Sequence, residues 1–130
     1  MFELDPRSRK SIYEQVMDSL KSAIMTGKLP KGEKLPSVRE LSKQISVNPN
    51  TVQKAYRELE RQGYIYTQTG VGTFVADKSE INADKQALQK AETEYSDAFK
   101  GLLYLGLDFN EAKELALRII ENIRKEGADE

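Results

Sequence analysis

Small polar side chains with hydrogen-bonding ends gather in the segment from Asn48 to Arg57, whose sequence is NPNTVQKAYR. The carboxamides of Asn and Gln can form paired hydrogen bonds with adenine, and Thr can contact the methyl group of thymine. The segment contains neither Asp nor Glu, so it carries no negative charge that would repel a phosphate. Its pattern indicates contacts to base edges and phosphates. The candidate residues are Asn48, Pro49, Asn50, Thr51, Gln53 and Lys54.

Two further segments carry side chains suited to the same partner. Ser37 and Arg39 stand at the start of another expected helix, where a hydroxyl and a guanidinium could contact the phosphate backbone or a base edge. Thr69 and Gly70 lie in a glycine-rich turn without carboxylates, whose backbone amides could approach a minor groove. Each feature also has an ordinary structural explanation: a helix cap, a surface ion pair or a tight turn. The elements that position these residues therefore decide between the interpretations.

Hydrophobic periodicity predicts three helices before the glycine-rich turn. Apolar residues recur at helical spacing over residues 9–26, and several Pro and Gly residues then force a loop over 28–36. Ser37 with Glu40 forms the pattern of a capping box, so a second helix begins there. Asn48 followed by Pro49 is typical of an N-cap and first helical position, and Gly63 ends this third helix.

After Gly63 the sequence pattern changes to that of strands. Residues 64–67 and 73–75 are rich in β-branched and aromatic side chains, and the turn between them contains Gly70 and Gly72. These glycines partly imitate a dinucleotide-binding loop, but no helix follows to hold a phosphate, so that interpretation is rejected. Three helices followed by a β-hairpin predict an α+β fold, a winged helix-turn-helix, over residues 1–76.

Residues 77–130 are expected to form a helical hairpin that pairs with a second copy. A polar linker over 77–80 precedes a long helix whose apolar residues follow a seven-residue repeat, with Asp84 as one polar exception. Gly106 interrupts the pattern, and Asp108 with Glu111 begins a last helix that reaches about Lys125. The expected dimerisation seam contains Ile81, Leu88, Ala91, Tyr95, Ala98, Leu102 and Leu105.

The composition restricts the classes of function. The chain contains no Cys and no His, which excludes disulfides, cysteine-ligated zinc and the usual catalytic triads. We therefore expect no catalytic residue, metal or cofactor. The net charge of −1 conceals an asymmetry, because residues 1–76 hold 12 Lys and Arg against 8 Asp and Glu, whereas residues 77–130 hold 8 against 13. Without a candidate membrane span or signal peptide, the expected location is the cytoplasm.

The segment LPSVRELSKQISVNPNTVQKAYRELERQGYIYTQTGVGTFV closely resembles the DNA-binding domain of GntR-family repressors, and the similarity extends over roughly residues 9–76. The short tail, which ends in LGLDFNEAKELALRIIENI, resembles the YtrA-like branch, whose members lack a large ligand-binding domain and dimerise through two helices. The chain differs from some relatives at Pro49 and Gln53, where they carry arginine, so their base preference cannot be transferred. The resemblance places Arg39, Asn48, Asn50, Thr51 and Gln53 at positions that contact operator DNA, and Thr69 and Gly70 at the wing tip.

These inferences together predict a transcription regulator, a repressor, that binds a pseudo-palindromic double-stranded operator as a homodimer. The alternative is a winged-helix module that binds another protein and never engages DNA. A small-molecule effector of unknown identity is a further candidate partner. Its pocket would involve the aromatic residues of the tail, which at helical spacing also suit a core. These residues are Tyr95, Phe99, Tyr104 and Phe109.

Overall fold

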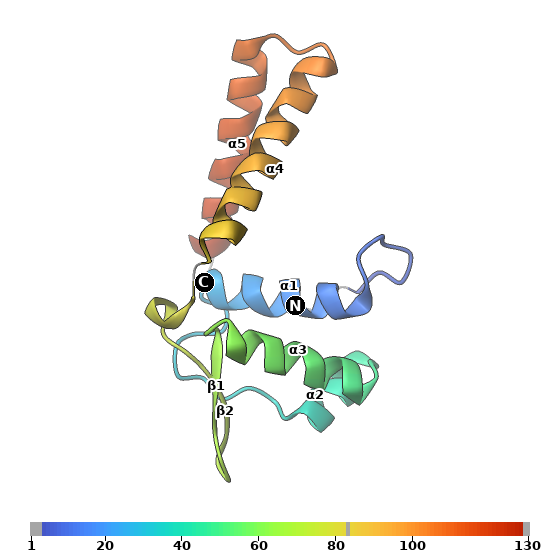
Figure 1. The fold of residues 1–130 in the computed structure, drawn as a ribbon, viewed down its shortest axis with the longest axis vertical. Coiled ribbons are helices and arrows are strands. Elements are labelled where there is room, and N and C mark those ends of the chain that lie inside the picture. The colour runs from blue at the N-terminus through green and yellow to red at the C-terminus, as the bar shows by residue number, and fades with distance from the viewer. Residues whose placement is uncertain (1–3, 83, 129–130) are drawn as a thin grey trace. The chain divides into compact units, whose positions relative to one another are not determined.

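Three helices and a two-stranded antiparallel hairpin follow one another in the first part of the chain (Figure 1). The computed structural model describes residues 4–82 and 84–128. Two compact units make up the chain, and the first ends at Asn82. The elements of the first unit are α1 (Ile12–Met25), α2 (Val38–Ile45), α3 (Pro49–Arg61), β1 (Ile65–Gln68), β2 (Gly72–Val75) and the short 3-10 helix η1 (Lys78–Glu80).

Side chains from all three helices and both strands build the core of the first unit. Val16 of α1, Val52 and Leu59 of α3, and Val75 of β2 are at most 1% exposed. This burial confirms the hydrophobic stripes expected from the sequence, and it makes α1, α3 and the hairpin one packed body. The other buried core residues are Met17, Leu20, Ile24, Leu35, Leu41, Ala55, Tyr56 and Ile65.

Local caps set where the helices begin. The hydroxyl of Ser11 accepts a hydrogen bond from the backbone amide of Glu14 at 3.1 Å, so α1 begins at Ile12, three residues later than expected. At α2, Ser37 and Glu40 form the predicted capping box. The side chain of Asn48 accepts from the backbone amide of Asn50 at 2.8 Å and caps α3. Helices α2 and α3 are thereby confirmed with the expected starts.

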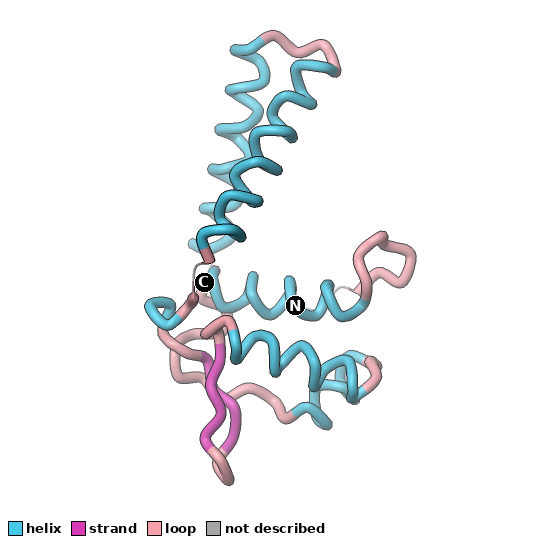
Figure 2. The backbone as a smooth tube through the Cα atoms, in the orientation of Figure 1, coloured by secondary structure: helices cyan, strands magenta, loops and turns pink. Residues whose placement is uncertain are grey.

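The hairpin, drawn in magenta in Figure 2, pairs Ile65 with Val75 and Gln68 with Gly72. Each strand is therefore shifted from its expected range, since β1 leaves out Tyr64 and β2 begins at Gly72. A third segment joins the hairpin through the bridge between Lys34 and Phe74, so the loop before α2 is part of the sheet edge. Three helices and this hairpin form the predicted winged helix-turn-helix.

Residues 77–82 belong to the first unit, six residues beyond the expected domain boundary at Ala76. The ammonium of Lys78 donates to the carbonyl of Met25 at 3.1 Å, and the amide of Asn82 donates to the carbonyl of Gln62 at 3.0 Å. The expected linker thus contains η1 and is hydrogen bonded to the helices of the first unit.

The second unit consists of two helices, α4 (Lys85–Tyr104) and α5 (Phe109–Ala128). Asp84, expected within the seam, instead caps α4 by accepting the amide of Gln86 at 2.9 Å. Ile81 therefore precedes α4 and lies outside the seam helix on which it was expected. Asp108 and Glu111 form the predicted reciprocal capping pair before α5.

Two of the four tail aromatics pack against each other within the helical hairpin. The rings of Phe99 and Phe109 meet edge to face, with centroids 5.7 Å apart. Tyr104, by contrast, is 82% exposed. Phe99 and Phe109 are thus explained as hairpin packing, which is the core role that the sequence left open beside a ligand pocket.

Candidate nucleic-acid interface

Helix α3 buries one face and leaves the other free. Val52, Ala55, Tyr56 and Leu59 form its buried stripe. The candidates Asn50, Gln53 and Lys54 are exposed, and Thr51 is half-buried at the margin. A helix held by one complete apolar face presents its opposite face without movement, so the polar side chains of its first two turns are available to a groove.

The first turn of α3 holds its candidate residues through local hydrogen bonds. The Asn48 side-chain oxygen is occupied by the amide of Asn50, so this residue has a structural role whatever its partner. Pro49 has no amide hydrogen and suits the first helical position, where none is required. The start of α3 contains no acidic residue in its first turn. Its partial positive charge therefore faces outward uncompensated and favours an anion such as phosphate.

Ser37 and Arg39 lie at the start of α2, in the same compact unit as α3. The amide of Ser37 donates to the Glu40 carboxylate at 3.1 Å, and the Ser37 hydroxyl accepts the amide of Glu40 at 3.1 Å. The hydrogen bond from the Ser37 amide, together with one from the Ser37 side chain, lowers the pKa of the Glu40 carboxyl, so this carboxylate is ionised at neutral pH. Arg39 is exposed and forms no salt bridge with any residue in 4–82 or 84–128.

A buried tyrosine joins α3 to the segment that leads into α2. Tyr56 is 6% exposed, and its hydroxyl donates to the carbonyl of Pro36 at 2.7 Å. Burial raises the pKa of this phenol above its usual value, so it remains a donor through the physiological range. Because Pro36 directly precedes Ser37, this bond fixes the distance between the two candidate contact elements.

The wing presents its tip to solvent. Thr69 and Gly70 are exposed, and Gly70 has a φ of 79°, the left-handed conformation that glycine adopts without strain. The carboxylate of Glu60 in α3 accepts the amide of Thr67 in β1 at 2.9 Å, which anchors the hairpin to the helix. The wing tip is therefore tied to the same rigid body as α3.

Lys54 and Arg57 occupy different sides of the exposed face. The ammonium of Lys54 lies 4.4 Å from the ring centroid of Tyr13, so it is held towards α1 by a cation–π contact. Arg57 is exposed and follows Asn50 by seven residues and Gln53 by four, which puts all three on one helix face. Sequence reasoning missed Arg57, although continuing the helical spacing beyond Lys54 would have identified it.

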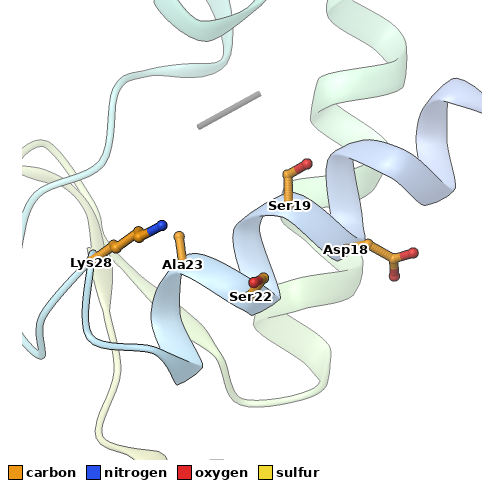
Figure 3. Close-up of a pocket in the computed structure, with 5 residues that line it drawn as sticks. All are labelled: Asp18, Ser19, Ser22, Ala23 and Lys28. Carbon is orange, nitrogen blue, oxygen red and sulfur yellow. The ribbon is translucent and has the colours of Figure 1, made fainter. Parts of the chain in front are cut away.

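The described residues also contain a pocket and acidic side chains away from the candidate interface. A pocket beside α1 is lined by Asp18, Ser19, Ser22 and Ala23 with Lys28 from the following loop (Figure 3). The carboxylate of Asp18 is paired with Lys10 at 2.7 Å. Within the described ranges, no group of three acidic residues could hold a metal ion. None of the helices in these ranges combines the length and apolar character that crossing a bilayer requires.

Comparisons with known proteins agree with this geometry. The model of the family described as bacterial regulatory proteins, gntR family, matches residues 12–75. The HTH-type transcriptional repressor YtrA of Bacillus subtilis (strain 168) is 38% identical over 128 residues, which are 95% of each chain. A transcriptional antiterminator from Listeria monocytogenes EGD-e has a crystal structure that is 39% identical, with a TM-score of 0.81 over 95% of this chain and 92% of that one.

A further solved structure contains operator DNA. The DNA-binding domain of AraR in complex with operator ORX1 is 37% identical, with a TM-score of 0.51 over 57% of this chain and 92% of that one. The similarity to AraR thus concerns the first unit, whereas the similarity to YtrA extends through the tail as well. The chain belongs to the GntR family of bacterial regulatory proteins and resembles YtrA over nearly its whole length.

Proposed function

We propose that this protein regulates transcription by binding an operator with α3 in the major groove, the start of α2 on the phosphate backbone and the wing tip at the minor groove. The observation that carries the proposal is the exposed face of α3, where Asn50, Gln53 and Arg57 stand opposite a fully buried stripe. A helix of this width fits the major groove, and polar side chains on its outer face can reach base edges.

The contacts divide into two kinds. Asn50, Thr51 and Gln53 are the candidates for base edges, where each well-formed pair contributes roughly 1 to 3 kcal/mol of discrimination. Ser37, Arg39 and the amides of the wing tip are the candidates for phosphates and the minor groove, and they supply affinity and register. The AraR domain bound to an operator supports this division, because it shares the fold of the first unit. We extend the repressor role of YtrA to this chain.

A second copy of the chain is the proposed partner of the helical tail. Leu88, Tyr95 and Leu105 of the seam are 65%, 58% and 80% exposed, and α5 adds exposed isoleucines. A monomer seldom leaves so many large apolar side chains in water. A groove between α4 and α5 could receive the partner's side chains. It is lined by Tyr95, Ala98, Phe99, Leu102, Ala116 and Ile119.

Dimerisation would complete the DNA-binding unit. Two copies related by a two-fold axis present two α3 helices to successive major grooves, so the operator should be pseudo-palindromic, with half-sites about one helical turn apart. Such a regulator would act in the cytoplasm, where a bacterial chromosome lies. Because the relatives are regulators rather than enzymes, the proposal includes no catalytic step.

The test is selection of bound duplexes from a random pool with purified protein. We expect a single enriched motif with two inverted half-sites. The double variant Asn50→Ala, Gln53→Ala should lose preference for that motif while keeping weak binding to unrelated duplexes. The exposed residue Gln89 of α4 provides the control, since Gln89→Ala should bind as the wild type does. If no motif is enriched with folded protein at low salt, the proposal is wrong and the protein-binding alternative becomes the better account.

A further inference from the structure

The segment before α2 lies against the wing through backbone hydrogen bonds and an isolated β-bridge, which the sequence did not predict. The amide of Gly32 donates to the carbonyl of Val75 at 2.8 Å, and the amide of Leu35 donates to the carbonyl of Thr73 at 2.8 Å. Lys34 lies between these bonds and bridges Phe74. Its backbone is therefore fixed against β2, and only its side chain is free to move.

The side chain of Lys34 crosses the hairpin at Gly72. A β-carbon added to Gly72 would lie 2.7 Å from Cε of Lys34 and 3.5 Å from its Nζ. The ammonium thus reaches the strand end beside the wing tip. A side chain at position 72 would occupy the path of the lysine, so the glycine keeps that path open.

The ammonium of Lys34 forms no salt bridge with any residue in 4–82 or 84–128. Lys31, on the same loop, differs in this respect, because its ammonium is paired with Asp77 at 2.9 Å. The pKa of Glu40 in the first turn of α2 is lowered mainly by hydrogen bonds from Ser37 and, to a smaller degree, by Lys34. Lys34 therefore stands between the wing and the start of α2.

We infer that Lys34 is a phosphate contact on the DNA strand that separates the groove occupied by α3 from the groove met by the wing. This inference rests on the proposed function. If α3 fills the major groove and the wing tip enters the adjacent minor groove, the sugar-phosphate backbone passes between the two elements. Lys34 lies there, beside Gly72 and three residues before Ser37, and its ammonium forms no salt bridge with the described residues.

A phosphate contact has a characteristic effect on salt dependence. Each one contributes about 0.9 to the slope of log affinity against log salt concentration, so losing two in a dimer should reduce the slope by about 1.8. Between 50 and 200 mM salt the wild type should then lose about twelvefold more affinity than Lys34→Gln. The effect should be equal on the selected operator and on a random duplex, because phosphates carry no sequence information.

The experiment measures affinity for both duplexes over this salt range with the full chain. Lys34→Gln should show the shallower slope on both, whereas the control Lys31→Gln should keep the wild-type slope. Thermal unfolding of each variant, followed by circular dichroism, verifies that the fold is retained.

The possible outcomes separate this inference from the proposed function. A wild-type slope for Lys34→Gln would overturn the inference while leaving operator binding intact. A loss confined to the selected operator would also overturn it, since that result would indicate a base contact. If the wild type bound neither duplex, the proposed function would fail, and the phosphate contact would fail with it.

Discussion

Replacing Tyr56 by Phe tests how firmly the structure joins α3 to the start of α2. The substitution keeps the buried ring and removes only the hydroxyl, which donates to the carbonyl of Pro36 at 2.7 Å. No cavity of the size of a side chain is created, so the lost hydrogen bond is the main change. Pro36 is half-buried, and its carbonyl must then find water or remain unsatisfied.

The expected loss of stability follows from this contact. A hydrogen bond of this kind contributes about 0.5 to 1.5 kcal/mol net, and the partly buried acceptor places the cost near the upper end. For a domain of this size, each kcal/mol lowers the melting temperature by about 4 to 8 °C. We therefore expect Tyr56→Phe to melt about 5 to 10 °C below the wild type. Tyr66 is the control, because it is 40% exposed and its hydroxyl donates to no residue within 4–82 or 84–128.

The same variant has a signature at alkaline pH. Burial raises the pKa of Tyr56, with a smaller effect from the charge of Glu40. Above pH ~10 the unfolded chain releases this proton while the folded chain retains it. The contribution of Tyr56 to stability is thus complete below pH ~10 and is lost as pH rises through the folded pKa.

Chemical unfolding between pH 8 and 11, followed by circular dichroism, measures this difference. The wild type should lose stability faster than Tyr56→Phe as the pH rises, while Tyr66→Phe should follow the wild type. Equal melting temperatures together with equal alkaline slopes for Tyr56→Phe and wild type would refute the reasoning, since the hydroxyl would then contribute nothing to the folded state.

Three further variants test other parts of the account. Arg39→Ala should weaken operator binding at least fivefold in a gel shift without lowering the melting temperature, and unchanged affinity would remove this residue from the interface. Gly63→Ala should lower the free energy of unfolding by at least about 2 kcal/mol, because φ is 85° there and the added β-carbon would overlap the backbone at the end of η1. A denaturation curve equal to that of the wild type would contradict this. The double variant Leu88→Glu, Leu105→Glu should lower the mass measured by light scattering to the 14.7 kDa of one chain. The control Tyr104→Glu, on the opposite side of α4, should remain a dimer. A double variant that keeps the dimer mass would exclude the seam.

Local signals predicted the starts of α2, α3 and α5. The pairs Ser37 with Glu40 and Asp108 with Glu111 lie three residues apart, and Asn48 stands directly before Pro49. Each cap is made by side chains within one helical turn, so its sequence pattern contains nearly all of the geometry. This is why the elements that carry the candidate interface could be placed without coordinates.

One local cap and two non-local contacts account for what the sequence did not reveal. The seven-residue spacing alone suggested that Ile81 belongs to the seam helix. Asp84 instead caps the beginning of α4, so the helix starts after Ile81. The β-bridge of Lys34 depends on Phe74 of β2, which lies forty residues later in the chain. Lys54 turns towards Tyr13 of α1, a contact that no pattern within α3 contains.

A reagent that cleaves DNA where it is tethered provides the most direct measurement of how α3 meets the duplex. The chain contains no Cys, so Gln53→Cys would carry an iron chelate at one defined site in each copy. The account predicts cleavage at two positions related by the operator's symmetry, about ten base pairs apart, and no cleavage from the chelate at Gln89→Cys in α4. Operator-bound protein that cleaves equally from both positions, or only from α4, would contradict the insertion of α3 into the major groove.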